Sequence, residues 1–311
     1  CFLFQTGLIK VLESNDFDIL VFFGDWKYLS YWKAVKHFTK KNTPCLFWSH
    51  GVLKNNEGFN NKLKYRFFNI FEKGGFLYSS SAKEVMKSSG YDKELSVIYN
   101  SLDYINQKKY LEYKNYKTTE KLFSNEYPYL IFSGRFIPIR KLNLLLESIK
   151  ELKNKGVYLN LLLVGNGPTE KELKSQVRML KIDKQVNFYG ACYDELLMSK
   201  LFKESECCVF PGPIGLTLIH AMTYGVPVVT NDNIEGHKPE IDAFIPNQTG
   251  VLFKDNDSNS LSLAIEKVLN LSSEEKSLMK KKSKEIVERK YNPIVQVELM
   301  NKRFRELKDD K

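Results

Sequence analysis

Three cations stand together where a predicted strand ends and a helix begins. Residues 129–134, YLIFSG, form a short apolar run that ends in glycine, which is typical of a buried parallel strand. Arg135 follows directly, and Arg140 and Lys141 precede residues 142–153, which have helical spacing. Arg can grip two oxygens at once and Lys adds a point charge, so this group suits a pyrophosphate. The alternative is a solvated helix start that binds nothing.

A second candidate lies in residues 207–230, which carry no Asp, Glu, Lys or Arg in a protein that is 27% charged. Pro and Gly interrupt this segment well short of the ~20 apolar residues that a membrane-spanning helix needs. Its pattern is strand, glycine turn, helix and strand. We expect the amide groups of Gly215, Leu216 and Thr217 to be open at the helix N-terminus, where they attract phosphate or carboxylate. A turn without a ligand is the alternative, since every doubly wound fold has several.

The stretch PGPIGLTLIHAMTYGVPVV, residues 211–229, resembles the signature of family 4 retaining glycosyltransferases with the GT-B fold. The matching residues are Pro211, Gly215, Leu216, Ala221, Met222, Gly225, Pro227 and Val228. Two glutamates of the signature are absent. Gly212 stands in place of the first, which the family associates with the donor sugar, and His220 in place of the second, associated with the ribose. The resemblance implies that His220 hydrogen-bonds a ribose hydroxyl or a phosphate; the alternative is a histidine merely packed in the helix.

The resemblance extends to the cations. The stretch that starts at Gly134 is similar to the family's Gly-Arg…Lys-Gly motif, whose Arg and Lys hold the donor diphosphate. This places Arg135 on the diphosphate, together with either Arg140 or Lys141. The turn after a predicted strand at residues 186–190 is where family members usually seat the nucleotide base.

Two further residues are candidates at the ends of other segments. His50 follows a predicted strand, residues 44–49, and open α/β sheets place their ligands at such strand ends. Many members of the family have a histidine in the first domain close to the donor sugar, although a purely structural histidine is the alternative. Glu240 lies in a loop that is also similar to the family, and it is a candidate replacement for a missing glutamate.

The composition favours an anionic partner. Lys and Arg outnumber Asp and Glu by 47 to 37, which gives a net charge of +10 and a pI near 9.1. The excess is spread along the chain without a nucleic-acid motif, so we expect no nucleic acid. The five cysteines are odd in number and lack metal-ligand spacing, which favours a reducing cytoplasm and predicts neither a disulfide framework nor a metal site. The resemblance also implies no metal cofactor.

The length of 311 residues predicts two domains. The resemblance implies an α/β protein of the GT-B type, with two doubly wound Rossmann-like domains facing a central cleft. We expect an acceptor-side domain at residues 1–127, a nucleotide-sugar domain at 128–290, and a C-terminal helix at 291–311 that crosses back to the first domain. Residues 104–127 are polar and aperiodic, which is typical of a linker. About four strands precede them, so we expect the N-terminal domain to lack its first strands.

Residues 60–71, NNKLKYRFFNIF, would form a helix with a basic side and an aromatic side. This composition suits contact with an anionic membrane surface. The alternative is a core helix with a solvated basic face.

The resemblance implies a cytoplasmic enzyme that moves a sugar from a nucleotide sugar to a saccharide or lipid-linked acceptor with retention, in the synthesis of a cell-surface polysaccharide. With the basic and aromatic helix, it also implies a peripheral position at the inner face of the membrane. The loss of both glutamates keeps open a degenerate protein that binds nucleotide sugars without transfer. A nucleotide-sugar epimerase of the GT-B fold is the other alternative.

Overall fold

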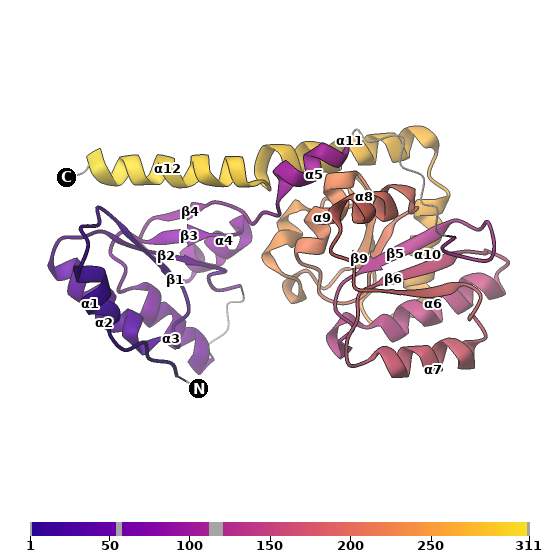
Figure 1. Cartoon of the computed structure of the whole chain (residues 1–311), viewed down its shortest axis with the longest axis horizontal. Helices are drawn as coiled ribbons and strands as arrows, with labels where there is room; N and C mark the ends of the chain where they lie inside the picture. Colours follow the sequence, from indigo (N-terminus) through magenta and orange to yellow (C-terminus); the bar gives the residue numbers. More distant parts are fainter. Residues whose placement is uncertain (1, 54–57, 112–120, 310–311) are drawn as a thin grey trace. The chain divides into compact units, whose positions relative to one another are not determined.

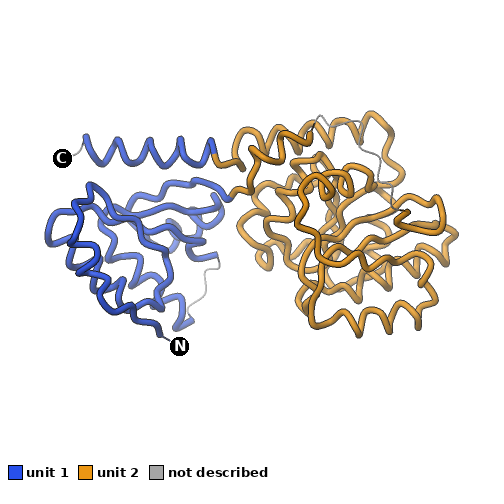
Figure 2. The backbone as a smooth tube through the Cα atoms, viewed as in Figure 1, with its two compact units in different colours: residues 1–100, 294–311 blue, residues 101–293 orange. Residues whose placement is uncertain are grey.

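The structure of the chain, a computed structural model, describes residues 2–53, 58–111 and 121–309. The chain forms two compact units, which Figure 2 distinguishes by colour. The first comprises residues 1–100 and 294–311, and the second comprises residues 101–293. Among the described residues, no helix is both long and apolar enough to cross a lipid bilayer.

The second unit is built on a six-stranded parallel sheet with the order β10-β9-β8-β5-β6-β7. Its strands are β5 (Tyr129–Ser133), β6 (Asn160–Val164), β7 (Val186–Gly190), β8 (Cys208–Phe210), β9 (Val228–Asn231) and β10 (Gly250–Phe253). The central strands are apolar and buried on both faces, as parallel strands covered by helices must be.

Helices cover both faces of this sheet, so the unit is doubly wound (Figure 1). The helices are α5 (Tyr104–Leu111), α6 (Leu142–Asn154), α7 (Glu170–Leu180), α8 (Glu195–Glu204), α9 (Leu216–Tyr224), α10 (Ser258–Leu269) and α11 (Ser273–Lys290). One group packs around α6, which contacts α7 and α10, and another around α9, which contacts α8 and α11. Three 3₁₀ turns complete the unit: η1 (Pro138–Arg140), η2 (Ile234–Gly236) and η3 (Pro239–Ala243).

The strand order creates a switch point between β5 and β8. From β5 the chain adds β6 and β7 on one side, then returns to place β8, β9 and β10 on the other. The loops that leave β5 and β8 therefore diverge, and ligands of open α/β sheets bind in the crevice at the carboxyl ends of such strands. This topology makes the loops after Ser133 and Phe210 the natural walls of a site.

The first unit holds a four-stranded parallel sheet with the order β1-β2-β3-β4. The strands are β1 (Leu20–Phe23), β2 (Cys45–Ser49), β3 (Gly75–Leu77) and β4 (Leu95–Val97), in line with the count of about four strands predicted from the sequence. Its helices are α1 (Leu8–Glu13), α2 (Leu29–Lys40), α3 (Phe59–Phe68), α4 (Ser80–Ser88) and α12 (Pro293–Asp309). The first four pack on one face, and the apolar side of α12 packs on the other against Leu46, Phe76 and Ile98.

Two predictions about local structure need correction. Residues 104–111 of the predicted linker form α5, because Tyr104 and Gln107 are buried and the helix packs on α8 and α9. The second unit accordingly begins at Ser101, so the predicted boundary after residue 127 lies inside it. The remainder of the predicted linker includes residues 112–120, which lie outside the described residues.

The helix with basic and aromatic sides follows the core alternative. Phe67, Phe68 and Phe71 are fully buried and pack with Phe47 in the core of the first unit. Its aromatic side is therefore taken up by the core, and contact with a membrane stays a prediction that rests on the basic side alone.

Replacement of Leu307 by Ala in α12 should destabilise the first unit. The Leu307 side chain is 1% exposed and packs in the cluster with Leu46, Phe76 and Ile98, so its truncation should cost about 2–5 kcal/mol in the free energy of unfolding. All three tryptophans, Trp26, Trp32 and Trp48, lie in this unit, so urea unfolding followed by tryptophan fluorescence measures it directly.

Val297 provides the matched control in the same helix. Its side chain is 53% exposed, so Val297→Ala should change the free energy of unfolding by no more than about 0.5 kcal/mol. Equal effects of the two substitutions would show that α12 does not anchor the unit through Leu307.

Candidate functional site

A pocket of about 450 Å³ lies at the carboxyl edge of β5, β6 and β7. Its lining residues are Ser133, Gly134, Arg135, Val164, Gly165, Asn166, Ala191, Cys192 and Tyr193. Arg135 is exposed and forms no ion pair with any described residue. Tyr193 is 93% exposed at the rim. The pocket thus offers an open guanidinium, exposed peptide groups and an aromatic ring.

The N-terminus of α9 lies beside this pocket. The hydroxyl group of Thr217, in the first turn of α9, donates a hydrogen bond to the carbonyl oxygen of Ser133 at 3.2 Å. Ser133 is the last residue of β5 and lines the pocket two residues before Arg135. The switch point therefore brings the first predicted cation and the helix N-terminus to adjacent positions, although they are far apart in the sequence.

A larger hollow of about 590 Å³ lies elsewhere on the second unit, lined by α10, α11, Asn247 and Gln248. Asn247 and Gln248 come just before β10, so they mark the amino edge of the sheet. Ligands of parallel α/β sheets bind at the carboxyl edge. The smaller pocket at the switch point is therefore the candidate site.

Arg140 and Lys141 are engaged by the protein itself. Arg140 donates a hydrogen bond from Nη1 to the carbonyl oxygen of Pro213, and its guanidinium lies 5.1 Å from the ring centre of Phe210. Burial lowers the pKa of Arg140. The ammonium group of Lys141 lies 2.5 Å from Oδ1 of Asp255. Burial of Asp255 opposes its ionisation, but the hydrogen bonds from Lys141 and Asn233 outweigh this effect, so the pKa of Asp255 is lowered.

Glycine at position 212 is required by its neighbours. A Cβ there would lie 2.1 Å from the carbonyl oxygen of Ile139 and 2.7 Å from Cα of Arg140. The η1 turn therefore occupies the space into which a side chain at this position would point. Together with the bond from Arg140 to Pro213, this packing fixes the loop after β8 against the loop after β5.

The carboxylate of Glu240 lies next to the start of α9. Glu240 is buried in η3, and its Oε2 is 3.6 Å from the place where a Cβ would stand on Gly215. The side-chain stem of Lys238 also lies beside Gly215, at 3.3 Å from the same point. The structure therefore brings Glu240 to the predicted anion-binding turn, together with the stem of Lys238, a residue that the sequence did not single out.

His220 points to α8. Its Nε2 lies 2.7 Å from Oε1 of Glu195, which also accepts a hydrogen bond of 2.5 Å from the hydroxyl group of Tyr224. The ring packs against Phe202 and Tyr224, with centroid distances of 4.7 and 5.6 Å. Burial of Glu195 is outweighed by these partners, so the pKa of Glu195 is lowered. Contact of His220 with a ribose stays a prediction.

His50 belongs to the first unit, whereas the other candidate residues belong to the second. It follows β2, is exposed, and its ring centre lies 4.9 Å from that of Tyr78. Its role near a donor sugar stays a prediction.

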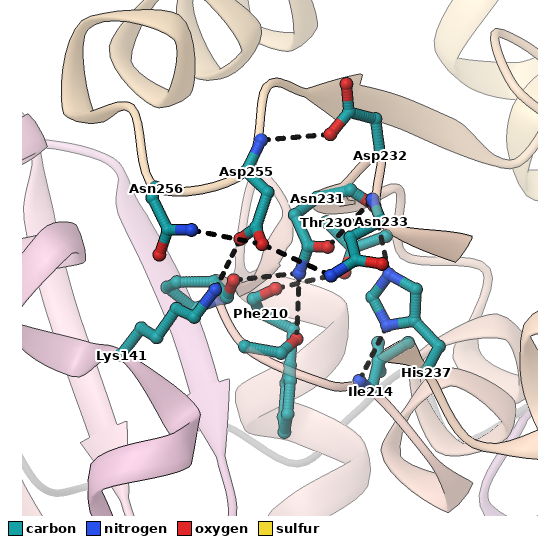
Figure 3. Close-up of polar contacts among 12 residues, drawn as sticks. Lys141, Phe210, Ile214, Thr230, Asn231, Asp232, Asn233, His237, Asp255 and Asn256 are labelled. Carbon is teal, nitrogen blue, oxygen red and sulfur yellow. Dashed lines mark hydrogen bonds and ion pairs between the residues drawn. The ribbon is translucent and has the colours of Figure 1, made fainter. Parts of the chain in front are cut away.

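The loop from Pro211 to Ile214 is held by a hydrogen-bond network that the sequence analysis missed (Figure 3). The side-chain amide of Asn231, at the end of β9, donates to the carbonyl oxygens of Pro211 at 2.9 Å and Gly212 at 3.2 Å. The amide N–H of Ile214 donates to Nδ1 of His237 at 3.0 Å, and Nε2 of His237 donates to the carbonyl oxygen of Asn231 at 2.9 Å. No pattern in the sequence links Ile214 to a residue 23 positions later.

The donors at this candidate site can bind a compact anion. An open guanidinium, the side-chain stem of Lys238 and the first amides of α9 lie at the same edge of the sheet. Such donors stabilise phosphate oxygens without further rearrangement. Among the described residues, no group of three or more His, Cys, Asp or Glu side chains is placed to hold a metal ion.

Comparisons with known proteins agree with this fold. Residues 115–286 match the family Glycosyl transferases group 1. The chain is 23% identical over 175 residues to the putative colanic acid biosynthesis glycosyltransferase WcaL of Escherichia coli K12, a match that spans 53% of this chain and 42% of that protein.

Two solved structures share its architecture. The lipopolysaccharide outer core galactosyltransferase WaaB, in its apo form, has a TM-score of 0.71 and 17% identity, over 96% of this chain and 78% of its own. Anabaena Alr3699/HepE in complex with UDP has a TM-score of 0.69 and 15% identity, over 95% and 80%. These likenesses confirm the predicted GT-B fold class. Since the family match covers more than half of the residues, the chain belongs to the Glycosyl transferases group 1 family.

Proposed function

We propose that the chain is a glycosyltransferase that moves a sugar from a nucleoside diphosphate sugar to a saccharide or lipid-linked acceptor, with retention of anomeric configuration. The family supports the reaction class. The similar proteins named for colanic acid and lipopolysaccharide support a role in cell-surface polysaccharide synthesis, and the neighbour solved with UDP supports the donor class. We propose that the enzyme is cytoplasmic and contacts anionic lipid through the basic side of the helix at residues 60–71.

One observation carries the proposal. The pocket at the switch point has Arg135 in its wall and the N-terminus of α9 at its side, and the bond from Thr217 to Ser133 joins the two. A diphosphate fits between a cation and open amides, and the volume near 450 Å³ leaves room for a nucleoside.

The same arrangement accounts for catalysis. When the glycosidic bond to the diphosphate breaks, negative charge grows on the phosphate oxygens. Fixed donors at this point stabilise the transition state more than the ground state, and each is worth about 3 kcal/mol. We assign this role to Arg135, Lys238 and the amides of Gly215–Thr217. We assign Arg140 and Lys141 to holding the loops, since both already bind protein oxygens.

The charge of the leaving group is balanced by protein cations in this proposal, so we propose that no metal cofactor is needed. Activity should then survive treatment with a chelator. A loss of activity in chelator, restored by a divalent cation, would contradict this part of the proposal.

A binding protein without transferase activity is the second candidate. It is favoured by Gly212, where η1 leaves no room for a carboxylate, and by His220, whose ring is paired with Glu195.

Incubation with a panel of nucleotide sugars and saccharide acceptors separates the candidates. Release of nucleoside diphosphate with transfer of an α-linked sugar from an α-linked donor supports the proposal. Binding without release indicates the binding protein, and a free 2-epimer indicates an epimerase.

Replacement of Arg135 by Ala should weaken both donor affinity and turnover. Loss of one charged donor from the diphosphate should lower kcat/KM by about 10²- to 10³-fold, because the growing charge loses a fixed partner. Arg178→Ala is the matched control, since Arg178 is exposed on α7 in the same unit. If Arg135→Ala behaves like the control, Arg135 has no place in the donor site.

Cys192 offers a chemical probe of the same pocket. Cys192 is partly exposed at the pocket wall, whereas Cys45, Cys207 and Cys208 are buried. Burial raises the pKa of Cys192 above the ordinary value of 9.0, so its alkylation should be slow at neutral pH and should quicken as the pH rises through 9. Iodoacetamide should therefore modify Cys192 first among these four.

Saturating UDP should slow this reaction at least tenfold by filling the pocket. Mass spectrometry of a Cys1→Ser variant provides the site-by-site rates, because Cys1 lies outside the described residues. An unchanged rate at Cys192 in the presence of bound UDP would place the nucleotide elsewhere.

A further inference from the structure

The loop that leads into α9 depends on a single histidine. Both peptide groups of Ile214 bond to the same segment: its N–H donates to Nδ1 of His237 at 3.0 Å, and its carbonyl oxygen accepts from the amide of Lys238 at 3.0 Å. Ile214 directly precedes Gly215, where the amides of the candidate anion site begin. The position of these amides is thus set by residues 237 and 238. Figure 3 shows the contact of Ile214 with His237.

The hydrogen bonds fix the protonation state of His237. A carbonyl oxygen can only accept, so Nε2 must carry a proton to bond with Asn231. An amide N–H can only donate, so Nδ1 must be bare to accept from Ile214. Only the neutral ring with its proton on Nε2 makes both bonds. A second proton on Nδ1 would face the N–H group of Ile214. Two donors cannot form a hydrogen bond, so the contact with Ile214 would break.

The surroundings favour the neutral ring at pH 7. His237 is 5% exposed, and burial lowers its pKa below the ordinary value of 6.5. The bond to Asn231 and the charge of Asp255 act in the opposite direction, and Lys141 acts in the same direction as burial. Asp255 and Lys141 are paired with each other, so their effects largely offset. Two further carboxylates are close to His237 along the chain: Glu235 is exposed in η2, and Glu240 is buried beside Gly215.

We propose that His237 is a positioning residue for the donor site: its neutral ring holds the loop at Ile214 so that the amides of Gly215–Thr217 converge on the diphosphate, and its protonation releases that loop. The inference rests on the proposed function for the identity of the anion. Beyond the proposed function, it assigns a role to a residue that does not touch the substrate. It also predicts how donor affinity changes with pH. Donor affinity falls in acid, at a pH set by His237.

The direction of the pH effect follows from the difference in proton binding between the ordered and the released loop. In the unfolded chain His237 titrates near 6.5, and in the folded protein it titrates lower. Below pH 6.5 the unfolded or released state therefore binds more protons than the ordered one, and the ordered loop loses stability as the pH falls through the lowered pKa of His237. Above pH 6.5 the full effect of the neutral ring is present.

Two substitutions separate the two hydrogen bonds of the ring. In His237→Asn, the amide oxygen stands at the position of Nδ1 and can still accept from Ile214, although the bond to Asn231 is lost. In His237→Gln, the amide reaches the position of Nε2 and can still donate to Asn231, although the acceptor for Ile214 is lost. Neither side chain titrates.

The first measurement is the affinity for UDP-glucose between about pH 5 and pH 8, by calorimetry. This probe is a diphosphate diester, so it lacks the second phosphate ionisation near pH 6 that would obscure the effect. We expect the wild-type protein to lose affinity about tenfold or more in acid, His237→Asn to lose this acid dependence, and His237→Gln to bind about tenfold more weakly at pH 7.5. His37→Gln, a change in the first unit where His37 pairs with Glu13, should retain the wild-type profile.

The second measurement reads the loop without a ligand. Hydrogen exchange of residues 211–217, corrected for the intrinsic effect of pH, should quicken in acid in the wild-type protein and remain constant in His237→Asn. Thermal unfolding at pH 7.5 shows that each variant is folded. An acid dependence that persists in His237→Asn, or wild-type affinity in His237→Gln, would overturn the inference. If exchange behaves as expected but no member of the panel of nucleotide sugars binds, the hold of His237 on the loop stands and the proposed function fails.

Discussion

The divergence of the chain at β5 and β8 is the constraint on which the rest of the second unit depends. Because the two strands are neighbours in the sheet but their chains leave in opposite directions, the loops after Ser133 and Phe210 face each other at one edge. The hydroxyl group of Thr217 then joins the loops across the gap. This arrangement brings an exposed arginine and a helix N-terminus into one candidate site.

The cations at this edge have two different environments. Arg135 is open to the pocket, whereas Arg140 and Lys141 bind Pro213 and Asp255. Burial of a cation costs less free energy when the cation has a hydrogen-bond partner. Arg140 and Lys141 therefore hold the loops in place, and Arg135 remains open to the pocket. The two positions that differ from the family signature, Gly212 and His220, also serve packing within the protein. The η1 turn packs on Gly212, and Glu195 binds His220.

Local patterns predicted the elements well where periodicity and breakers agree. The strand predicted at residues 129–134 is β5, and the helical spacing of residues 142–153 corresponds to α6. Packing decided the other cases. Residues 104–111 carry no clear period, yet they form α5 because Tyr104 and Gln107 are buried on packing against α8 and α9. The pairing of His220 with Glu195 and the role of His237 depend on contacts across more than twenty residues, which spacing cannot reveal.

The central claim is that a diphosphate binds between Arg135 and the first turn of α9. A crystal structure of the chain with UDP tests it most directly. The account predicts diphosphate oxygens within hydrogen-bond distance of the Arg135 guanidinium and of the amides of Gly215–Thr217. UDP bound in the hollow between α10 and α11, or at any place away from the carboxyl edge of β5 and β8, would contradict it.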